Sequence, residues 1–258
     1  MILNPTMKSS RMQMRSLCIA AMAALALPMS AEAAVILAVD FGGGTGNVQS
    51  GFQGFTNPAD GGISGTQTYS GITVTVDGGT NTSGTGSAGF LNSRDRTHAP
   101  PNAGAYSNYS LLRDRIVSTG GTQGVMLTIS GLAPDTDYVL QVWGFDTRAA
   151  VTGENVGAKP GTNILWDNTA GSDYELGRYT MAAGDLPVDN NSFSITSTLT
   201  TDSSGTIVVR SYNPTSSTRI DGSGIMNGFM LSQVPEPSAS LLAVAGASLF
   251  LSRRRRLA

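Results

Sequence analysis

Short segments in which apolar and polar residues alternate occupy the middle of the chain. The alternation is clearest at 72–76 and 125–129, where every second residue is Val, Ile or Leu. A period of two residues places the apolar side chains on one face of a β-strand. Further short apolar segments, bounded by Gly, Asn, Asp, Ser or Pro, lie at 35–39, 138–143, 193–195, 207–209 and 229–231. The pattern therefore predicts strands in all seven segments.

Helical periodicity is weak in the same region. No segment repeats apolar residues with a 3.6-residue period over three turns, and the best candidate, 109–117, fits one short helix or a strand. Many short strands separated by turn residues predict an all-β fold, an antiparallel β-sandwich resembling a jelly roll. We expect this domain to span residues 34–232.

A loop at 131–138 leads into one of the predicted strands. Its sequence, Gly-Leu-Ala-Pro-Asp-Thr-Asp-Tyr, spaces Leu132 and Tyr138 so that both side chains turn inward. The loop is similar to the corner of fibronectin type III domains and related sandwiches, where a tyrosine hydroxyl hydrogen-bonds back to the backbone. The resemblance implies such a bond for Tyr138. The alternative, a plain core aromatic, also favours a sandwich.

Both ends of the predicted sandwich carry a second pattern. Residues 225–231 read Ile-Met-Asn-Gly-Phe-Met-Leu, and the first predicted strand ends in Asp40-Phe41-Gly42. These segments resemble the last and first strands of malectin-like and galactose-binding-like jelly rolls. The resemblance implies a domain with a carbohydrate-binding face. A fibronectin-type module alone accounts for only about 100 residues.

Residues 1–33 have the features of a secretory signal peptide. Three basic residues precede an apolar stretch at 17–27, which we expect to be a signal helix, and Pro28 ends that stretch. Ala31 and Ala33 are the small residues of a cleavage site after Ala33. The apolar stretch is too short to span the ~30 Å hydrocarbon core of a membrane. The alternative to a signal peptide is a buried N-terminal helix.

Residues 233–258 form a tail of three parts. A Pro-Glu-Pro motif comes first, an apolar stretch follows at 239–251, and four arginines come next. The apolar stretch predicts a short transmembrane helix, and the arginines would hold its end in the cytoplasm. The residues concerned are Pro235, Glu236, Pro237, Arg253, Arg254, Arg255 and Arg256.

This order of parts resembles a PEP-CTERM sorting signal. The resemblance implies export through the general secretory route and recognition by an exosortase, a membrane-embedded cysteine transpeptidase that removes the tail. It also implies transient anchoring in the inner membrane and delivery to the cell surface or extracellular matrix of a Gram-negative bacterium, often alongside exopolysaccharide. The alternative is an uncleaved C-terminal anchor.

Charge is distributed unevenly among these parts. The whole chain carries a net charge of −2, but the two ends hold seven of its 16 basic residues and two of its 18 acidic ones. Residues 34–232 therefore carry a net charge of −7, which disfavours nucleic acid and anionic membranes as partners. Neutral glycans, or acidic ones bridged by cations, suit this charge better. The single cysteine, Cys18, lies in the predicted signal peptide, so we expect the mature domain to have no disulfide.

Catalytic motifs are weak. The glycine run at 42–46 lacks both the G-x-G-x-x-G spacing and a following Gly-Lys-Ser/Thr. The single histidine, His98, lies near Asp95, but the chain has no G-x-S-x-G motif. The mature domain has two glutamates, Glu154 and Glu175, so a glycosidase pair would depend on aspartates. We expect no enzyme activity; a divergent secreted hydrolase on the same scaffold is the alternative.

Calcium is the one cofactor that the sequence leaves open. The mature domain has 14 aspartates, and carboxylate oxygens suit Ca²⁺. The segments 135–137 and 185–191 are suggestive, but neither forms a D-x-[DN]-x-[DN]-G loop. We therefore assign no metal ligands and expect no other cofactor.

Aromatic residues near predicted strand ends provide candidates for a glycan site. Trp166 lies in what reads as a loop, beside Asp167 and Asn168, and Trp143 ends a predicted strand. Alternation with Val139 and Gln141 makes core packing the competing role for Trp143. The candidate glycan-binding residues are Trp166, Trp143, Asp146, Arg94 and Arg113. The sequence thus favours a non-enzymatic surface or matrix protein that binds polysaccharide; a purely structural matrix protein is a further alternative.

Overall fold

The computed structural model describes residues 33–41, 48–56, 64–78, 90–95, 106–119, 124–149, 155–158, 161–212 and 224–234. Residues Ala34–Val234 form one compact unit. The predicted signal helix and transmembrane helix, the glycine run at 42–46 and His98 lie outside the described residues. Among the residues that are described, no helix is long and apolar enough to span a membrane.

The fold is all-β and contains two large sheets. The first has five strands in the order β13-β8-β16-β1-β2, and the second has six in the order β12-β11-β14-β7-β4-β3. The five strands are β1 (Ala34–Asp40), β2 (Gln53–Gly54), β8 (Asp137–Trp143), β13 (Ser194–Thr200) and β16 (Gly228–Gln233). The six are β3 (Ser64–Tyr69), β4 (Ile72–Asp77), β7 (Val125–Ser130), β11 (Gly161–Asp167), β12 (Tyr174–Met181) and β14 (Ile207–Tyr212).

Two smaller sheets and a 3-10 turn complete the described elements. One sheet consists of β5 (Phe90–Asp95), β6 (Asp114–Thr119) and β15 (Ile225–Met226); the other consists of β9 (Thr147–Ala149) and β10 (Asn155–Ala158). The turn η1 (Thr169–Gly171) follows β11. Of the described pairings, only β1 with β2 is parallel. The antiparallel β-sandwich expected from the sequence is therefore confirmed.

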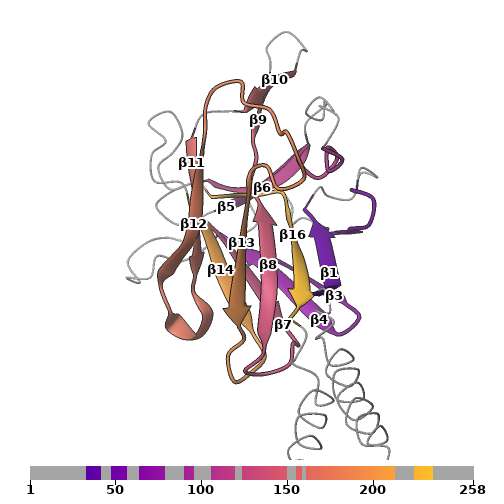
Figure 1. Cartoon of the computed structure of the whole chain (residues 1–258), viewed down its shortest axis with the longest axis vertical. Helices are drawn as coiled ribbons and strands as arrows, with labels where there is room; N and C mark the ends of the chain where they lie inside the picture. The colour runs from indigo at the N-terminus through magenta and orange to yellow at the C-terminus, as the bar shows by residue number, and fades with distance from the viewer. Residues whose placement is uncertain are drawn as a thin grey trace, which may run out of the picture. The chain divides into compact units, whose positions relative to one another are not determined.

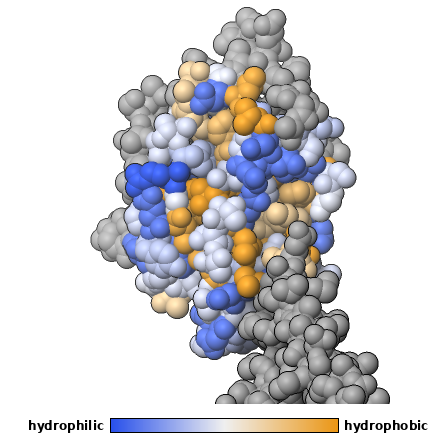
Figure 2. Space-filling view, in the orientation of Figure 1, coloured by the Kyte–Doolittle hydropathy of each residue, from blue (hydrophilic) through white to orange (hydrophobic). Residues whose placement is uncertain are grey.

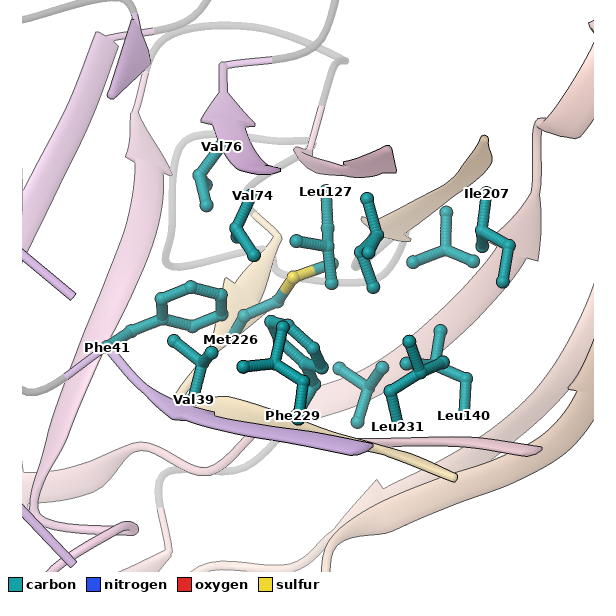
Figure 3. Packing of buried hydrophobic residues seen from close by; sticks show 14 of the residues in the cluster. Val39, Phe41, Val74, Val76, Leu127, Leu140, Ile207, Met226, Phe229 and Leu231 are labelled. Carbon is teal, nitrogen blue, oxygen red and sulfur yellow. The ribbon is translucent and has the colours of Figure 1, made fainter. Parts of the chain in front are cut away.

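The two large sheets pack face to face, with β8, β13 and β16 crossing in front of β14 and β7 (Figure 1). Leu140 and Phe229 from the first sheet share one buried cluster with Leu127 and Val209 from the second. Figure 3 shows Leu140 and Phe229 facing Leu127 between the layers. Their alternation along each strand leaves the intervening side chains on the outer faces.

Most of the expected strands are confirmed, with one shift. Segments 35–39, 72–76, 125–129, 138–143, 207–209 and 229–231 all lie within strands. Phe193 does not, because it has a positive φ of 58° just before β13. Residues 109–113 form turns and β6 begins at Asp114, so the alternative of a short helix at 109–117 is wrong.

The corner at 131–138 has the hydrogen bond implied by its resemblance. The hydroxyl of Tyr138 accepts from the backbone N–H of Ala133 at 3.1 Å. Tyr138 and Leu132 are both buried, as expected. Nearby, Thr201 closes the corner by accepting from the N–H of Thr136 and donating to the carbonyl of Ala133.

A second, smaller core adjoins the main one through Tyr179, which packs against both. It contains Tyr106, Leu111, Leu112, Trp143, Phe145 and Met181. On the face seen in Figure 2, apolar residues lie in small groups among hydrophilic ones. The aromatic residues of this second core, Tyr106, Trp143 and Phe145, are at most 1% exposed, so they are packed inside the domain.

Candidate functional site

Trp143 belongs to the second core rather than to a surface site. Its side chain is 1% exposed, and the indole Nε1–H donates to the carbonyl of Asn190 at 2.9 Å. The ring also meets Phe52 edge-on at 6.0 Å. Because its side chain is buried and its N–H is already bonded within the protein, Trp143 offers nothing to a ligand on the surface.

Asp146 is also buried, in an ion pair with Arg115. Asn227 supports the same region: its side-chain oxygen accepts from the N–H of Phe145, and its amide donates to the carbonyl of Asp114 at 2.6 Å. These contacts join the ends of β8, β6 and β16. The role the structure gives Asp146 is therefore to hold strands together.

The two arginine candidates lie on or beside β5 and β6. Arg113 is partly exposed, with its Nε 3.8 Å from a carboxylate oxygen of Asp114. Arg94 lies on β5 opposite Arg115, and its side chain is outside the described part of the structure. Neither lies on β11, which carries Trp166. The structure thus does not bring the five sequence candidates together.

Trp166 lies on a strand and not in a loop, which corrects the reading from sequence. It occupies β11, between Arg210 on β14 and Glu175 on β12. Its neighbour Leu165 points into the core, and a register shift separates the two residues. Trp166 shares a row with Arg210 on the outer face of the six-stranded sheet and is partly exposed.

Arg210 stacks between two aromatic rings. Its guanidinium carbon lies 5.9 Å from the ring centre of Trp166 and 5.8 Å from that of Tyr212. Both distances are within the range of cation–π attraction. The Nη2 group of Arg210 also approaches Asp173 at 3.4 Å, which fixes the guanidinium beside the rings.

Three polar atoms in this neighbourhood are buried without a hydrogen-bond partner. They are the Nε1 of Trp166, the Nε of Arg210 and the Oδ1 of Asn168. A buried polar group left unpaired costs about 1–3 kcal/mol. Most buried polar side-chain atoms in proteins pair with another protein group, an ordered water or an ion. We call Trp166, Asn168, Asp173, Arg210 and Tyr212 together the Trp166 site.

Acidic residues border the Trp166 site. Glu175 forms an exposed two-point ion pair with Arg178, and the guanidinium lowers the pKa of that carboxyl. The hydroxyl of Tyr174 hydrogen-bonds to Asp167, and this bond, followed by burial, raises the pKa of the tyrosine. Glu175 and Asp167 therefore already have partners of their own within the protein.

The segments that suggested calcium have their carboxylates engaged in the fold. Asp137 accepts from the hydroxyl of Thr200 at 2.6 Å, Asp185 from the N–H of Ala182 at 2.6 Å, and Asp189 from the N–H of Asn191 at 2.9 Å. Among the described residues, no three His, Cys, Asp or Glu side chains form a group that could hold a metal ion. The expectation of no cofactor, with a structural calcium as the alternative left open, stays a prediction.

The sequence analysis missed Arg210, Tyr212 and Asp173, and it named Asn168 only as a neighbour of Trp166. A signal was present, because Val-Arg-Ser-Tyr at 209–212 alternates and so places Arg210 and Tyr212 on one face. The pairing of β14 with β11, which brings both residues to Trp166, involves segments about 45 positions apart. No local pattern encodes that pairing.

Neither the scan against protein-family models nor the search of curated proteins found a match. Among solved structures, the ectodomain of ANX2 from Arabidopsis thaliana is similar over 79% of this chain and 50% of that one, with 8% identity and a TM-score of 0.42. The extracellular domain of ANXUR1 from the same plant is similar over 56% of this chain, at 7% identity and a TM-score of 0.39, and the match spans 39% of that protein. The CBM22-1 xylan-binding domain of Xyn10C from Paenibacillus barcinonensis is similar over 79% of this chain and 97% of that one, at 9% identity and a TM-score of 0.32.

Proposed function

We propose that the chain is a non-enzymatic binding protein that holds polysaccharide at the Trp166 site. The observation that carries this proposal is the stack of Trp166, Arg210 and Tyr212 on the outer face of a sheet. A sugar ring has an apolar C–H face that packs on an aromatic side chain and releases water, while its hydroxyls need hydrogen-bond partners at the edge. The site offers rings, a guanidinium, an amide and a carboxylate within one small area.

The outer face of the sheet extends this site into a polar track suited to a polymer. The row that contains Trp166 and Arg210 continues through Met126 to Asp77. The next row contains Thr128, Thr75 and Thr66, and the hydroxyls of the last two are 3.0 Å apart. A chain of sugars lying across the strands would therefore meet hydroxyl groups beyond the aromatic stack.

Binding rather than hydrolysis suits the carboxylates near the track. Glu175 is already paired with Arg178, and Asp167 accepts from the N–H of Thr169 at 2.7 Å. A general acid for glycoside cleavage needs a raised pKa, whereas Arg178 lowers that of Glu175. We therefore propose no catalytic residue here.

The tail gives the proposed destination. We propose that a transpeptidase of the exosortase type recognises Pro235, Glu236 and Pro237 and removes the residues that follow, after the short apolar helix has entered the inner membrane. Ala34 pairs with Gln233, so the first residue of the expected mature chain lies opposite the last residue of β16. Released at the cell surface or in the matrix, the domain would meet exopolysaccharide.

Mass spectrometry of the protein recovered from its native cells tests this destination. The expected C-terminal peptide lacks Arg253–Arg256, and the N-terminal peptide begins at Ala34. A recovered protein that retains the four arginines would contradict removal of the tail, without bearing on the binding site.

Affinity electrophoresis through gels that contain neutral and acidic bacterial polysaccharides tests the binding role. We expect at least one polysaccharide to retard the native protein and Trp166→Ala to lower that affinity about tenfold or more, since an aromatic platform is lost. Tyr109→Ala is the matched control, because Tyr109 is 45% exposed and lies outside the site. The proposal fails if no polysaccharide retards the protein, or if both variants bind like the parent.

A further inference from the structure

We infer that two copies of this domain pair with each other through strand β3, edge to edge and antiparallel. The strand is the last one in the six-stranded sheet, and among the described strands it pairs only with β4. An edge strand presents a row of backbone N–H and C=O groups that another strand can join. The inference concerns a part of the sheet remote from Trp166 and does not depend on glycan binding.

The turn that joins β3 to β4 determines which backbone groups face outward. Ser70 and Gly71 form a two-residue loop in which both have a positive φ, 49° and 92°, as a type I′ turn requires. In such a hairpin the pair that closes the loop exchanges hydrogen bonds, and bonded and non-bonded pairs alternate from there along the ladder. Counting back from Tyr69, Thr66 and Thr68 occupy non-bonded positions. Their N–H and C=O groups therefore point away from β4.

The side chains of these two threonines agree with that alternation. Thr66 lies opposite Thr75 and Thr68 lies opposite Thr73, and the hydroxyl oxygens are 3.0 Å apart in both pairs. Side chains approach each other more closely at non-bonded pairs than at bonded ones. Within the part of the chain that the structure describes, the backbone of neither threonine bonds to a loop or to a further strand. The outward edge of β3 is thus available to a partner strand.

Strand β3 lacks the features that usually protect an edge strand. Its sequence, Ser-Gly-Thr-Gln-Thr-Tyr, has no charged residue and no proline, and its pairing with β4 runs without a register shift. The opposite edge of the same sheet is different. There β12 carries Glu175 and Arg178, its register against β11 is shifted, and a Cβ at Gly177 would lie 3.0 Å from the side chain of Ile195 on β13. Of these two edges, β3 is the one that suits an added strand.

The sequence of β3 fits a second copy of itself. Because Thr66 and Thr68 lie symmetrically about Gln67, an antiparallel copy centred on that residue places Thr66 opposite Thr68 of the second copy. The outward N–H and C=O groups of the two threonines then bond to each other, and a Thr–Thr pair forms on the same face. In this register Tyr69 of one copy faces Gly65 of the other, where no side chain competes for space. A neutral strand also lets two domains that each carry a net charge of −7 approach each other.

This pairing has a consequence for the proposed glycan site. Two antiparallel strands are related by an axis perpendicular to their sheet, so the outer faces of both copies lie on one side. Three strands separate β11 from β3, and neighbouring strands are spaced by about 4.8 Å, which places the two Trp166 sites roughly 40 Å apart. A polysaccharide that reaches both sites would bind with avidity. The consequence rests on the proposed function, whereas the dimer itself does not.

Cysteine pairs test the register in the full-length protein with Cys18→Ser, which removes the only native thiol. One preparation carries Thr66→Cys and the other Thr68→Cys. Opposed residues of a bonded pair have Cα atoms about 5.5 Å apart, within the reach of a disulfide, whereas diagonal neighbours are about 7–8 Å apart. We expect mild oxidation to link the two preparations when they are mixed, and each one alone to link much less. A mixture of Thr196→Cys and Thr198→Cys is the matched control, because these residues have the same spacing and are exposed on β13.

Sedimentation velocity of the full-length protein in a zwitterionic detergent measures the association without a cross-link. We expect a dimer that forms as concentration rises, weakly, because one strand edge buries little surface. The double variant Thr66→Lys, Thr68→Lys places like charges opposite each other and should weaken dimerisation about tenfold or more. Thr196→Lys, Thr198→Lys on β13 should dimerise like the native protein. Thermal melting of each variant shows that it remains folded.

Three results would overturn the inference. They are a native protein that stays monomeric at every soluble concentration, a dimer that is equally strong with Thr66→Lys, Thr68→Lys, and cross-linking that is no greater in the mixed samples than in the unmixed ones. The outcome is separate from that of the polysaccharide gels. A protein that dimerises through β3 and binds no polysaccharide would remove the proposed function and leave this pairing in place.

Discussion

The two tryptophans of this chain occupy opposite kinds of environment. Trp143 is buried and its N–H donates to Asn190, whereas Trp166 is partly exposed and its N–H has no partner. Trp143 ends an alternating segment, whereas Trp166 follows the adjacent apolar residues Ile164 and Leu165, so the local pattern predicted a strand for the first and a loop for the second. What separates them is the layer each one faces, and that depends on which loops and strands pack nearby.

At the residue scale, the hydroxyl of Tyr138 should contribute measurably to stability. Tyr138→Phe removes the acceptor for the N–H of Ala133, which is then left unpaired beside the core. We expect the free energy of unfolding to fall by about 1–2 kcal/mol. Urea denaturation measures it, and Tyr109→Phe, at an exposed position, should change it by less than about 0.5 kcal/mol. Equal stability of the two variants would contradict a structural role for this hydroxyl.

Removing one partner of the buried ion pair of Arg115 and Asp146 should lower stability more than removing one partner of an exposed pair. Arg115→Met leaves a buried carboxylate without its cation, and such changes typically cost about 3–5 kcal/mol. The double variant Arg115→Met, Asp146→Leu removes both charges and should lose less stability than Arg115→Met alone. Arg178→Met, in an exposed pair, should change the urea midpoint little. A single variant that is as stable as the native protein would contradict the buried pairing.

At the element scale, the sequence predicts strands best where one face of the strand is buried and the other is exposed to solvent. The strands β4 and β7 alternate cleanly and were predictable from their sequences, because their outer faces carry Thr and Ser. The neighbouring strands β11 and β12 were not predictable from their sequences. Both β11 residues Ile164 and Leu165 are buried, and β12 carries Gly177 in a mostly polar sequence. Their strand character comes from pairing with β14 and with each other, which local sequence does not encode.

The turn between β13 and β14 should make stability depend on acidity. Asp202 accepts from the hydroxyl and N–H of Ser204 and from the N–H of Thr206, and these bonds hold its pKa below the ordinary value. The stabilisation is present above the ordinary pKa of aspartate and is lost as the pH falls through the lowered one. Asp202→Asn has no such dependence at this position.

Thermal unfolding between about pH 5 and about pH 2 checks this expectation, because carboxylates titrate across that range. The native protein should lose more of its Tm on acidification than Asp202→Asn does. Asp185→Asn is a useful comparison, since Asp185 also accepts a backbone N–H but lies in a different loop. A parallel fall in the native protein and in Asp202→Asn would contradict the role of Asp202 in the turn.

At the scale of the whole molecule, the sequence predicted the class of fold better than the site. Turn residues and short strands indicated a sandwich, and the Tyr138 corner supported it. The glycan candidates were scattered, because Trp143 and Asp146 are interior, Arg94 belongs to another sheet and Arg113 lies in the turn before β6. A site on the outer face of a sheet arises from long-range register, as the pairing of Trp166 with Arg210 shows.

The central claim is that polysaccharide binds at Trp166, and the indole resonances test it most directly. The chain has only two tryptophans, so a ¹H–¹⁵N spectrum of the full-length protein contains two indole signals. Titration with oligosaccharides of a polysaccharide that retards the protein in the gels should shift the Trp166 signal as its N–H gains a partner and leave that of Trp143, bonded to Asn190, in place. Trp166→Phe assigns the signals. If the Trp166 signal stays fixed at saturating oligosaccharide, or if only the Trp143 signal moves, the account is contradicted.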